Sequence, residues 1–334
     1  MNPLRRLLGA VRRRPLRTLA IVFLTAFVGL NVLAYRHARA MLTFDSAAPR
    51  TASPQALSLV EKLKVVACGV SVPRPENQRT PDALGLPFTT LRLRASDGVG
   101  LEAWQIDAPQ PRGTVLLFHG YAASRASLLG EAQAFHRLGY SVVLVDFRGG
   151  GGSDGNTTTL GFQEAGDVAT ALNHARTRSE LPRPHVLYGQ SMGGAAILRA
   201  VAVGDVRPDG IILDSVFDRM LGTVRNRFAL MKLPSFPTAE LLVFWGGRQS
   251  GFNGFEHNPA DYARRCECPT LVQIGALDRN VGQDESRALF ESLPEPKQYE
   301  VFADAGHVSL LAADPAKWTA NVERFFKSLA KREK

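Results

Sequence analysis

The sequence contains few cysteines, three among 334 residues. So small a number excludes a disulfide framework of the kind that supports small secreted domains. Cys266 and Cys268 are separated by one residue, which is poor geometry for a bond between them, and no histidines stand beside them at the spacing of a zinc site. We therefore expect the cysteines to be small buried side chains. The sequence also indicates no metal and no cofactor.

Acidic residues are absent from the first 40 positions, which contain eight arginines. The rest of the chain is close to neutral, so the formal net charge of +9 belongs to the N-terminus. A basic segment that leads directly into an apolar one is typical of a membrane protein. We therefore expect a membrane as partner and no nucleic acid.

Residues 19–35 form a stretch of 17 residues without charge, at the short end of the ~17–25 that span a bilayer. Six arginines precede the stretch and two follow it. This asymmetry predicts a transmembrane anchor with its N-terminus in the cytoplasm. The remainder of the chain would then lie outside, in the periplasm of a double-membraned bacterium.

A cleaved signal peptide is the alternative to a retained anchor. Ala38-Arg39-Ala40 has the small-x-small form of a cleavage site. However, the apolar run exceeds the ~7–15 residues usual in a signal peptide, and arginines crowd the candidate site. The sequence therefore favours a retained single-pass anchor over a cleaved signal, with a buried helix as the third interpretation.

The pattern divides the chain into four parts: a basic segment over residues 1–18, the anchor, a connector over residues 36–85, and a main domain over residues 86–330. The connector holds a short helical pattern within residues 54–70 and several prolines. In the main domain, residues 88–96 and 100–107 alternate between apolar and polar side chains. Such alternation predicts a hairpin of two half-buried strands.

After the hairpin, six short apolar runs alternate with amphipathic helical stretches. The runs cover residues 114–120, 141–147, 185–190, 210–215, 270–276 and 297–304. Such alternation predicts an α/β fold with a mainly parallel sheet flanked by helices. The connection over residues 216–259 has no strand pattern but many apolar residues, which predicts a helical insertion. It would be either a cap over a pocket or a cover for the core.

One serine stands between glycines at the junction of a strand and a helix. Gly189, Ser191 and Gly193 fit the G-x-S-x-G pattern, and Gly194 follows. In a nucleophile elbow, a sharp strand-to-helix turn lifts the serine hydroxyl to the carboxyl end of the sheet, where bulky neighbours would clash. We therefore predict that Ser191 is a catalytic nucleophile; the alternative is a purely structural turn.

A serine nucleophile needs a base, and the base needs an orienting carboxylate. Asp278 and His307 each follow a predicted strand, at the edge where sites of open α/β sheets assemble. We expect His307 to be the base and Asp278 the acid. Asp214 also ends a strand and is the alternative acid, while Asp284 and Asp304 are less well placed.

The oxyanion hole is expected to combine two backbone N–H groups. One belongs to Met192, the residue after the nucleophile, and the other to the loop after the third strand. In that loop Gly120 allows a turn that points the N–H of Tyr121 inward. We expect His119 to brace this loop rather than to act as a second base.

A second glycine pattern is a weaker motif. Gly150, Gly152 and Gly155 match G-x-G-x-x-G, but turn-forming residues follow where a dinucleotide site needs a helix. A glycine-rich loop beside the active site, braced by Arg148 and Asp154, is the better interpretation.

Together these segments resemble the α/β-hydrolase superfamily, and specifically bacterial membrane-anchored serine hydrolases similar to lysophospholipase-like and ABHD-type enzymes. The resemblance is carried by "LLFHGYAAS", "VLVDFRGGGGSDG", "YGQSMGG", "GALDRNV" and "AGH", in this order over residues 116–307. It implies a Ser191–His307–Asp278 triad with Tyr121 and Met192 as oxyanion donors. The superfamily is broad in substrate, so the resemblance does not choose one.

Three functions remain open from the sequence. The first is a serine esterase, with the anchor and the apolar insertion favouring acyl esters that are lipid-like, such as lysophospholipids. The second is a peptidase on the same fold, and the third a non-catalytic envelope scaffold. The sequence favours the esterase because every element of the triad is present, and it leaves the oligomeric state open.

Overall fold

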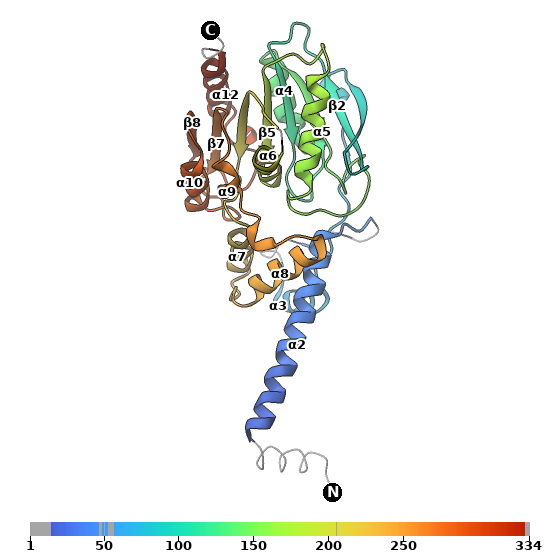
Figure 1. Cartoon of the computed structure of the whole chain (residues 1–334), viewed down its shortest axis with the longest axis vertical. Coiled ribbons are helices and arrows are strands. Elements are labelled where there is room, and N and C mark those ends of the chain that lie inside the picture. The colour runs from blue at the N-terminus through green and yellow to red at the C-terminus, as the bar shows by residue number, and fades with distance from the viewer. Residues whose placement is uncertain (1–14, 47–48, 50, 53–56, 205, 331–334) are drawn as a thin grey trace.

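An eight-stranded sheet forms the centre of the main domain (Figure 1). The computed structural model describes residues 15–46, 49, 51–52, 57–204 and 206–330. The strands are β1 (Thr89–Arg94), β2 (Gly100–Ile106), β3 (Thr114–Phe118), β4 (Ser141–Val145), β5 (His185–Gln190), β6 (Gly210–Asp214), β7 (Thr270–Gly275) and β8 (Lys297–Phe302). Their order across the sheet is β1-β2-β4-β3-β5-β6-β7-β8, and only β2 of these runs antiparallel to the others. The predicted α/β fold with a mainly parallel sheet is confirmed.

Helices cover both faces of the sheet. One face carries α4 (Leu129–Arg137), α11 (Leu310–Ala313) and α12 (Pro315–Ala330), and the short helix η2 (Arg125–Leu128) leads into α4. The other face carries α5 (Glu164–Arg176), α6 (Met192–Val203), α9 (Pro259–Ala263) and α10 (Gln283–Ser292). Strands covered on both sides are mostly apolar, which explains why they form near-continuous apolar runs in the sequence. In β5, for example, Val186 and Tyr188 belong to one core and Leu187 to the other.

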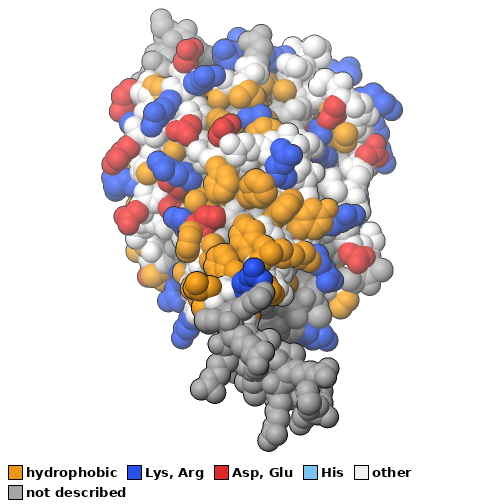
Figure 2. Space-filling model, turned by 60° about the horizontal axis from the view of Figure 1, so that its bottom comes forward, with side chains coloured by type: hydrophobic (Ala, Val, Ile, Leu, Met, Phe, Trp, Pro, Cys, Tyr) orange, Lys and Arg blue, Asp and Glu red, His pale blue; other side chains and the backbone are white. Residues whose placement is uncertain are grey.

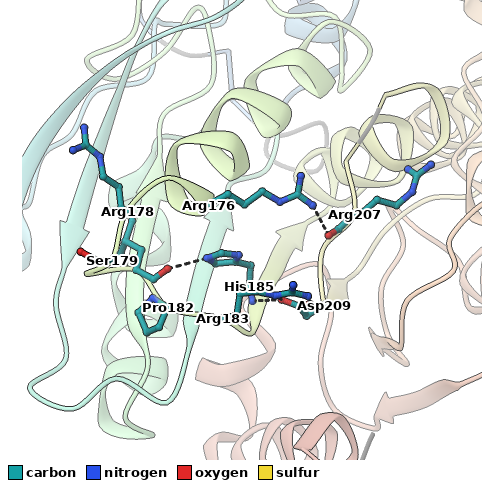
Figure 3. A pocket seen from close by; sticks show the side chains of 9 residues that line it. Arg176, Arg178, Ser179, Pro182, Arg183, His185, Arg207 and Asp209 are labelled. Atoms are coloured by element: carbon teal, nitrogen blue, oxygen red, sulfur yellow. Dashed lines mark hydrogen bonds and ion pairs between the residues drawn. The ribbon is translucent and has the colours of Figure 1, made fainter. Parts of the chain in front are cut away.

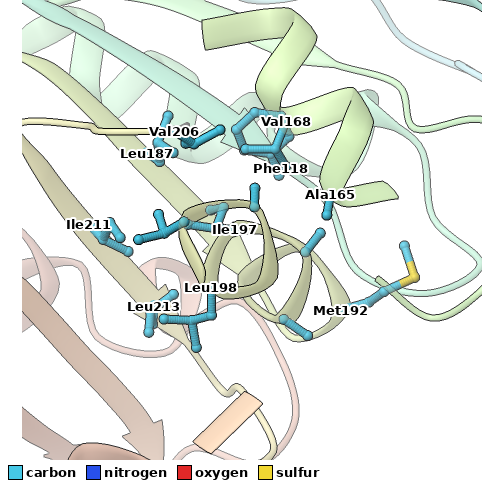
Figure 4. Close-up of a cluster of buried hydrophobic side chains, with 14 of the residues drawn as sticks. Phe118, Ala165, Val168, Leu187, Met192, Ile197, Leu198, Val206, Ile211 and Leu213 are labelled. Atoms are coloured by element: carbon cyan, nitrogen blue, oxygen red, sulfur yellow. The ribbon is translucent and has the colours of Figure 1, made fainter. Parts of the chain in front are cut away.

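Helix α6 is fixed to the sheet by its apolar side chains. Ile197 and Leu198 are fully buried among Leu187 of β5, Leu213 of β6 and Val168 of α5 (Figure 4). Burying a side chain of this size contributes about 1.5–3 kcal/mol. The first residue of α6 is therefore held firmly at the carboxyl edge of the sheet.

The long connection after β6 is helical, as its apolar pattern predicts. It contains α7 (Met220–Met231), α8 (Thr238–Ser250) and the short helix η3 (Gly254–Glu256), which lie beyond the carboxyl ends of the strands (Figure 1). Met220 and Val243 are buried in the core, whereas Phe236 and Phe244 are exposed. The insertion, hereafter the cap, thus covers the core with one face and leaves the other open.

Helix α2 (Pro15–Leu42) extends well past the charge-free stretch that the sequence marks. No glycine or proline follows before Pro49, so nothing stops the helix at residue 35. The large apolar side chains from Leu16 to Val32 are exposed by 51% to 82%, with Leu30 as the exception, but Ala34 and Ala38 are buried where α2 packs on α8.

The connector expected over residues 36–85 is therefore partly ordered structure. Its first turns belong to α2, and it also contains α3 (Leu59–Cys68) and η1 (Pro81–Leu84). Helix α3 begins at a capping box, in which Ser58 and Glu61 bind each other's backbone N–H groups. Most of the basic segment expected over residues 1–18 lies outside the described residues.

Candidate active site

Ser191 lies between β5 and α6 in a backbone conformation that side chains rarely adopt. Its φ is 51° and its ψ −115°, outside the common regions for a residue with a Cβ. The Ser191 N–H donates to the Asp214 carbonyl oxygen at 2.8 Å, which ties the turn to the end of β6. This strand–turn–helix geometry is that of a nucleophile elbow.

The glycines around Ser191 are required by space. A Cβ on Gly193 would lie 2.2 Å from the Phe118 carbonyl oxygen, and one on Gly189 would lie 2.5 Å from the Gly194 nitrogen. Real Cβ atoms do not approach backbone so closely. The first turn of α6 can therefore touch β3 and β5 only because these positions lack side chains.

His307 and Asp278 come together from the loops after β8 and β7. His307 Nδ1 lies 2.7 Å from Asp278 Oδ2, while Asp278 Oδ1 accepts the N–H groups of Asn280 and Val281 at 2.9 and 3.0 Å. A carboxylate can only accept, so the neutral form of His307 carries its proton on Nδ1 and has a lone pair on Nε2. The Asp278 side chain is fully buried, and that of His307 is 25% exposed.

Among the described residues, the Ser191 hydroxyl makes no hydrogen bond with His307. The structure therefore brings the predicted acid and base together, but it leaves the contact between nucleophile and base unformed. Such contacts are often long without substrate and tighten in the reacting complex.

Asp214, the alternative acid, faces a different part of the molecule. Its Oδ2 accepts from the Tyr188 hydroxyl at 2.7 Å and from Trp318 Nε1 at 3.3 Å, and its Oδ1 accepts from Gln273 Nε2 at 3.0 Å. Burial raises the pKa of the Asp214 carboxyl to about 7. Both oxygens are occupied inside the core, so Asp214 is not in contact with His307.

The predicted oxyanion residues lie on two sides of Ser191. A Cβ on Gly120 would lie 3.7 Å from Ser191 Cβ, so the loop after β3 touches the nucleophile. Tyr121 follows in that loop, and its hydroxyl donates to the Met41 carbonyl oxygen at 2.6 Å. Met192 is the first residue of α6, and the N–H groups of the first turn of a helix have no acceptor within that helix.

His119 is bound at both ring nitrogens. Its Nδ1 donates to the Gly120 carbonyl oxygen at 2.8 Å, and its Nε2 accepts the Phe147 N–H at 3.1 Å. Burial lowers the pKa of this imidazole, which favours the neutral form. These contacts agree with a bracing role in the loop.

The glycine-rich loop after β4 is filled by protein groups. The N–H of Gly152 donates to Asp146 Oδ2 at 2.8 Å, and the Arg74 guanidinium donates to carbonyl oxygens of the loop. Arg148 binds Asp167 and Asp97, and Asp154 accepts the Gly100 N–H at 2.9 Å. The donors and acceptors of this loop thus bind the protein itself.

A surface cavity of about 490 Å³ lies at the opposite ends of the strands (Figure 3). Four of its nine lining residues are arginines, of which Arg183 binds Asp209 and Arg176 donates to the Arg207 carbonyl oxygen. His185, the first residue of β5, also lines it, whereas Ser191 follows the last residue of that strand. This cavity is therefore separate from the candidate active site.

The sequence does not predict that the end of α2 reaches the candidate active site. Besides the contact of Met41 with Tyr121, the Leu42 carbonyl oxygen accepts the Thr158 N–H at 3.0 Å. The Thr158 hydroxyl in turn lies 3.5 Å from the Met192 sulfur. The absence of glycine and proline after residue 35 could have predicted that the helix continues. The contacts with Tyr121 and Thr158 could not be predicted, because they join segments distant in sequence.

Comparison with known proteins assigns the family. The profile of the family described as serine aminopeptidase, S33, matches residues 109–220. An uncharacterized membrane protein of Saccharomyces cerevisiae is 30% identical over 217 residues, 64% of this chain and 71% of that protein. The α/β-hydrolase domain-containing protein WAV2 of Arabidopsis thaliana is 31% identical over 146 residues, 42% of this chain and 47% of that protein.

Solved structures lead to the same family. An esterase of Pyrococcus furiosus superposes with a TM-score of 0.66 and 26% sequence identity, over 77% of this chain and 96% of the esterase. The fold and the elbow define an α/β-hydrolase. The chain belongs to the α/β-hydrolase superfamily, and it is a hydrolase.

Replacing the two candidate acids separates their roles. We expect Asp278→Asn to lower kcat by about 10⁴, because an amide no longer fixes the required tautomer of His307. Asp214→Asn should lower stability by about 1–3 kcal/mol, since its amide would face hydrogen-bond donors, but should leave kcat nearly unchanged. Ester hydrolysis and thermal unfolding of both variants check this. Equal losses of kcat would contradict the assignment.

The packing of the elbow can be tested at one glycine. Gly193→Ala should lower the free energy of unfolding by about 1–3 kcal/mol, because its Cβ meets backbone that cannot move aside. Gly130→Ala is the matched control, since a Cβ there would lie 3.8 Å from Leu311 in ordinary contact. Urea unfolding in detergent measures both. A Gly193→Ala protein as stable as the control would disprove the steric argument.

Proposed function

We propose that the protein is a serine hydrolase that cleaves carboxylic esters through an acyl-enzyme intermediate. The observation that carries the proposal is the 2.7 Å contact of His307 Nδ1 with Asp278, on the same edge of the sheet as the strained Ser191 turn. Structural neighbours that are esterases, among them the Pyrococcus furiosus enzyme, support an ester substrate of small-molecule size.

The proposed reaction has two halves. His307 Nε2 takes the proton of the Ser191 hydroxyl while Oγ attacks the acyl carbonyl carbon, and His307 then returns the proton to the departing alcohol. A water molecule attacks the acyl-enzyme with His307 again as base, and the acid product leaves with Ser191 restored. Asp278 stays ionised and stabilises the imidazolium that forms in each half.

Negative charge on the acyl oxygen would be stabilised by the N–H groups of Met192 and Tyr121. Met192 begins a helix of 12 residues, so the helix dipole adds to its N–H. One such donor is worth about 10²–10³ in kcat. The opposing hypothesis is that the protein is a non-catalytic envelope scaffold. That hypothesis predicts no activated serine.

A peptidase is the second candidate, because the matching family is described as serine aminopeptidase. The same acyl-enzyme chemistry would then release an amine instead of an alcohol. Parallel panels of esters of graded chain length and of aminoacyl amides separate the two. Esters are the more reactive acyl donors and both enzyme types can cleave them, so hydrolysis of the amides identifies a peptidase and its absence an esterase.

A fluorophosphonate probe tests the activated serine directly. We expect it to label the wild type and not Ser191→Ala, and to label His307→Ala far more slowly, because the hydroxyl needs its base. Loss of the nucleophile should also lower kcat for esters by about 10⁶. Ser179→Ala, an exposed serine at the other end of the sheet, is the control and should label normally. Absence of labelling in folded wild type would overturn the proposal.

The proposed location is a membrane, with α2 as a retained single-pass anchor and its arginine-rich end in the cytoplasm. Within Leu16–Leu42, the most apolar window of 18 residues has a mean hydropathy of 2.0, and only 6% of that window is buried. The Saccharomyces cerevisiae relative is described as a membrane protein. Retention is supported by Ala38, part of the candidate cleavage site, which is 4% exposed within α2.

Retention of the anchor predicts the mature N-terminus. The protein should stay in the membrane fraction after an alkaline carbonate wash and should dissolve only in detergent, because a spanning apolar helix does not leave the bilayer in water. Its intact mass should include α2. A mature chain that begins at Met41 would identify a cleaved signal peptide instead.

A further inference from the structure

We propose that the outer face of the cap lies on the membrane surface, so that the active site opens toward the bilayer and takes esters that reside in it. We define the docking face as Leu233, Phe236 and Phe244, of the α7–α8 loop and α8. The inference deepens the proposed function and rests on its two parts, the anchor and the serine hydrolase.

The first argument is the length of the lipid-exposed part of α2. At ~1.5 Å per residue, the exposed stretch from Leu16 to Val32 is about 25 Å long, less than the ~30 Å of a hydrocarbon core. A core that begins at Leu16 therefore extends to the level of Tyr35. Tilt of the helix would bring the upper boundary higher still.

The second argument is that α8 is fixed to α2 at this level. Trp245 Nε1 donates to Asn31 Oδ1 at 3.1 Å, and Gln249 Nε2 donates to the Tyr35 carbonyl oxygen at 3.0 Å. The rings of Tyr35 and Trp245 meet edge to face with centroids 5.4 Å apart. Tyrosine and tryptophan are the residues enriched at the boundary between hydrocarbon and headgroups. The upper boundary of the bilayer therefore coincides with the cap.

The third argument is the composition of the docking face. Phe236 is 75% exposed, Phe244 43% and Leu233 39%. Hydrophobic side chains gather at the end of the molecule from which α2 projects (Figure 2). Apolar groups beside a spanning helix bury themselves in lipid without a further partner.

Basic side chains border the docking face. Lys232 precedes Leu233, and Arg248 stands four residues after Phe244 and thus on the same side of α8. Both are exposed, and neither forms an ion pair with any residue that the structure describes. Their apolar stems can lie along the surface while their charges reach the lipid headgroups.

The docking face is also on the side of the active site. The cap and the loops that carry Asp278 and His307 all follow the carboxyl ends of the strands, the end from which α2 projects (Figure 1). Next to these two residues, Leu277 is 61% and Val308 54% exposed. An ester in the outer part of the bilayer would thus meet apolar side chains on its way to Ser191.

Tryptophan quenching by brominated lipid tests the docking. The full chain is placed in nanodiscs of brominated or ordinary phosphatidylcholine, and the added signal of Phe236→Trp is compared with the parent protein. Trp104 and Trp318 are buried, and Trp245 at the proposed boundary is present in both proteins, so the difference between them reports position 236 alone. The same substitution at Ser179, at the other end of β5, is the control. We expect quenching at position 236 and none at position 179. An unquenched position 236 overturns the docking on lipid, and this result also includes the case in which a second copy of the chain covers the docking face.

Hydrolysis of two esters then tests the direction of access. In the Leu233→Ser/Phe236→Ser variant, hydrolysis of a long-chain ester in vesicles should fall by about tenfold, because two apolar side chains would no longer be buried in lipid. Hydrolysis of a short soluble ester should stay unchanged. Val203→Ser, 58% exposed at the far end of α6, should change neither rate.

The outcomes separate this inference from the proposed function. Equal rates of the variant and the wild type on the vesicle ester overturn access from the membrane. A wild type that hydrolyses neither ester overturns the serine hydrolase, and the access claim with it, while the quenching result still decides whether the cap touches lipid.

Discussion

The close approach of α6 to the end of β3 fixes the geometry on which the candidate site depends. Gly193 touches the Phe118 carbonyl, and the two residues that follow Phe118 lead directly to Tyr121. One contact between backbones therefore sets the distance between the two expected sources of oxyanion hydrogen bonds. It also explains the strained turn at Ser191, since a relaxed turn would start α6 at another place.

Asp214 and Asp278 show how similar positions take different roles. Asp214 ends the apolar strand β6 and Asp278 follows the apolar strand β7, yet Asp214 points into the core, where Tyr188, Gln273 and Trp318 join it to β5, β7 and α12. Burial raises its pKa to about 7, a cost that the three donors partly offset. Asp278 instead lies in a loop that supplies two backbone donors to one oxygen and leaves the other for histidine.

The sequence predicts the sheet, the elbow and the residues of the site because each depends on local pattern. Apolar runs define strands, and G-x-S-x-G implies a turn whose steric needs are local. The sequence ranks Asp278 before Asp214 but leaves Asp214 open as the alternative acid, because a pattern does not contain the direction in which a side chain leaves its strand. A sequence pattern also does not predict which face of the cap is buried, or that Ala34 and Ala38 pack on α8. These contacts join segments some 200 residues apart.

The end of α2 connects position in the membrane with the geometry of the site. Its carbonyl groups at Met41 and Leu42 accept from Tyr121 and from Thr158, and Thr158 reaches Met192. Both expected oxyanion residues are thus bound, directly or through one residue, to the helix that the bilayer would hold. A helix needed only as a tether could end in a flexible linker. If α2 spans a bilayer as proposed, its contacts with Tyr121 and Thr158 would instead fix the height of Ser191 above the lipid.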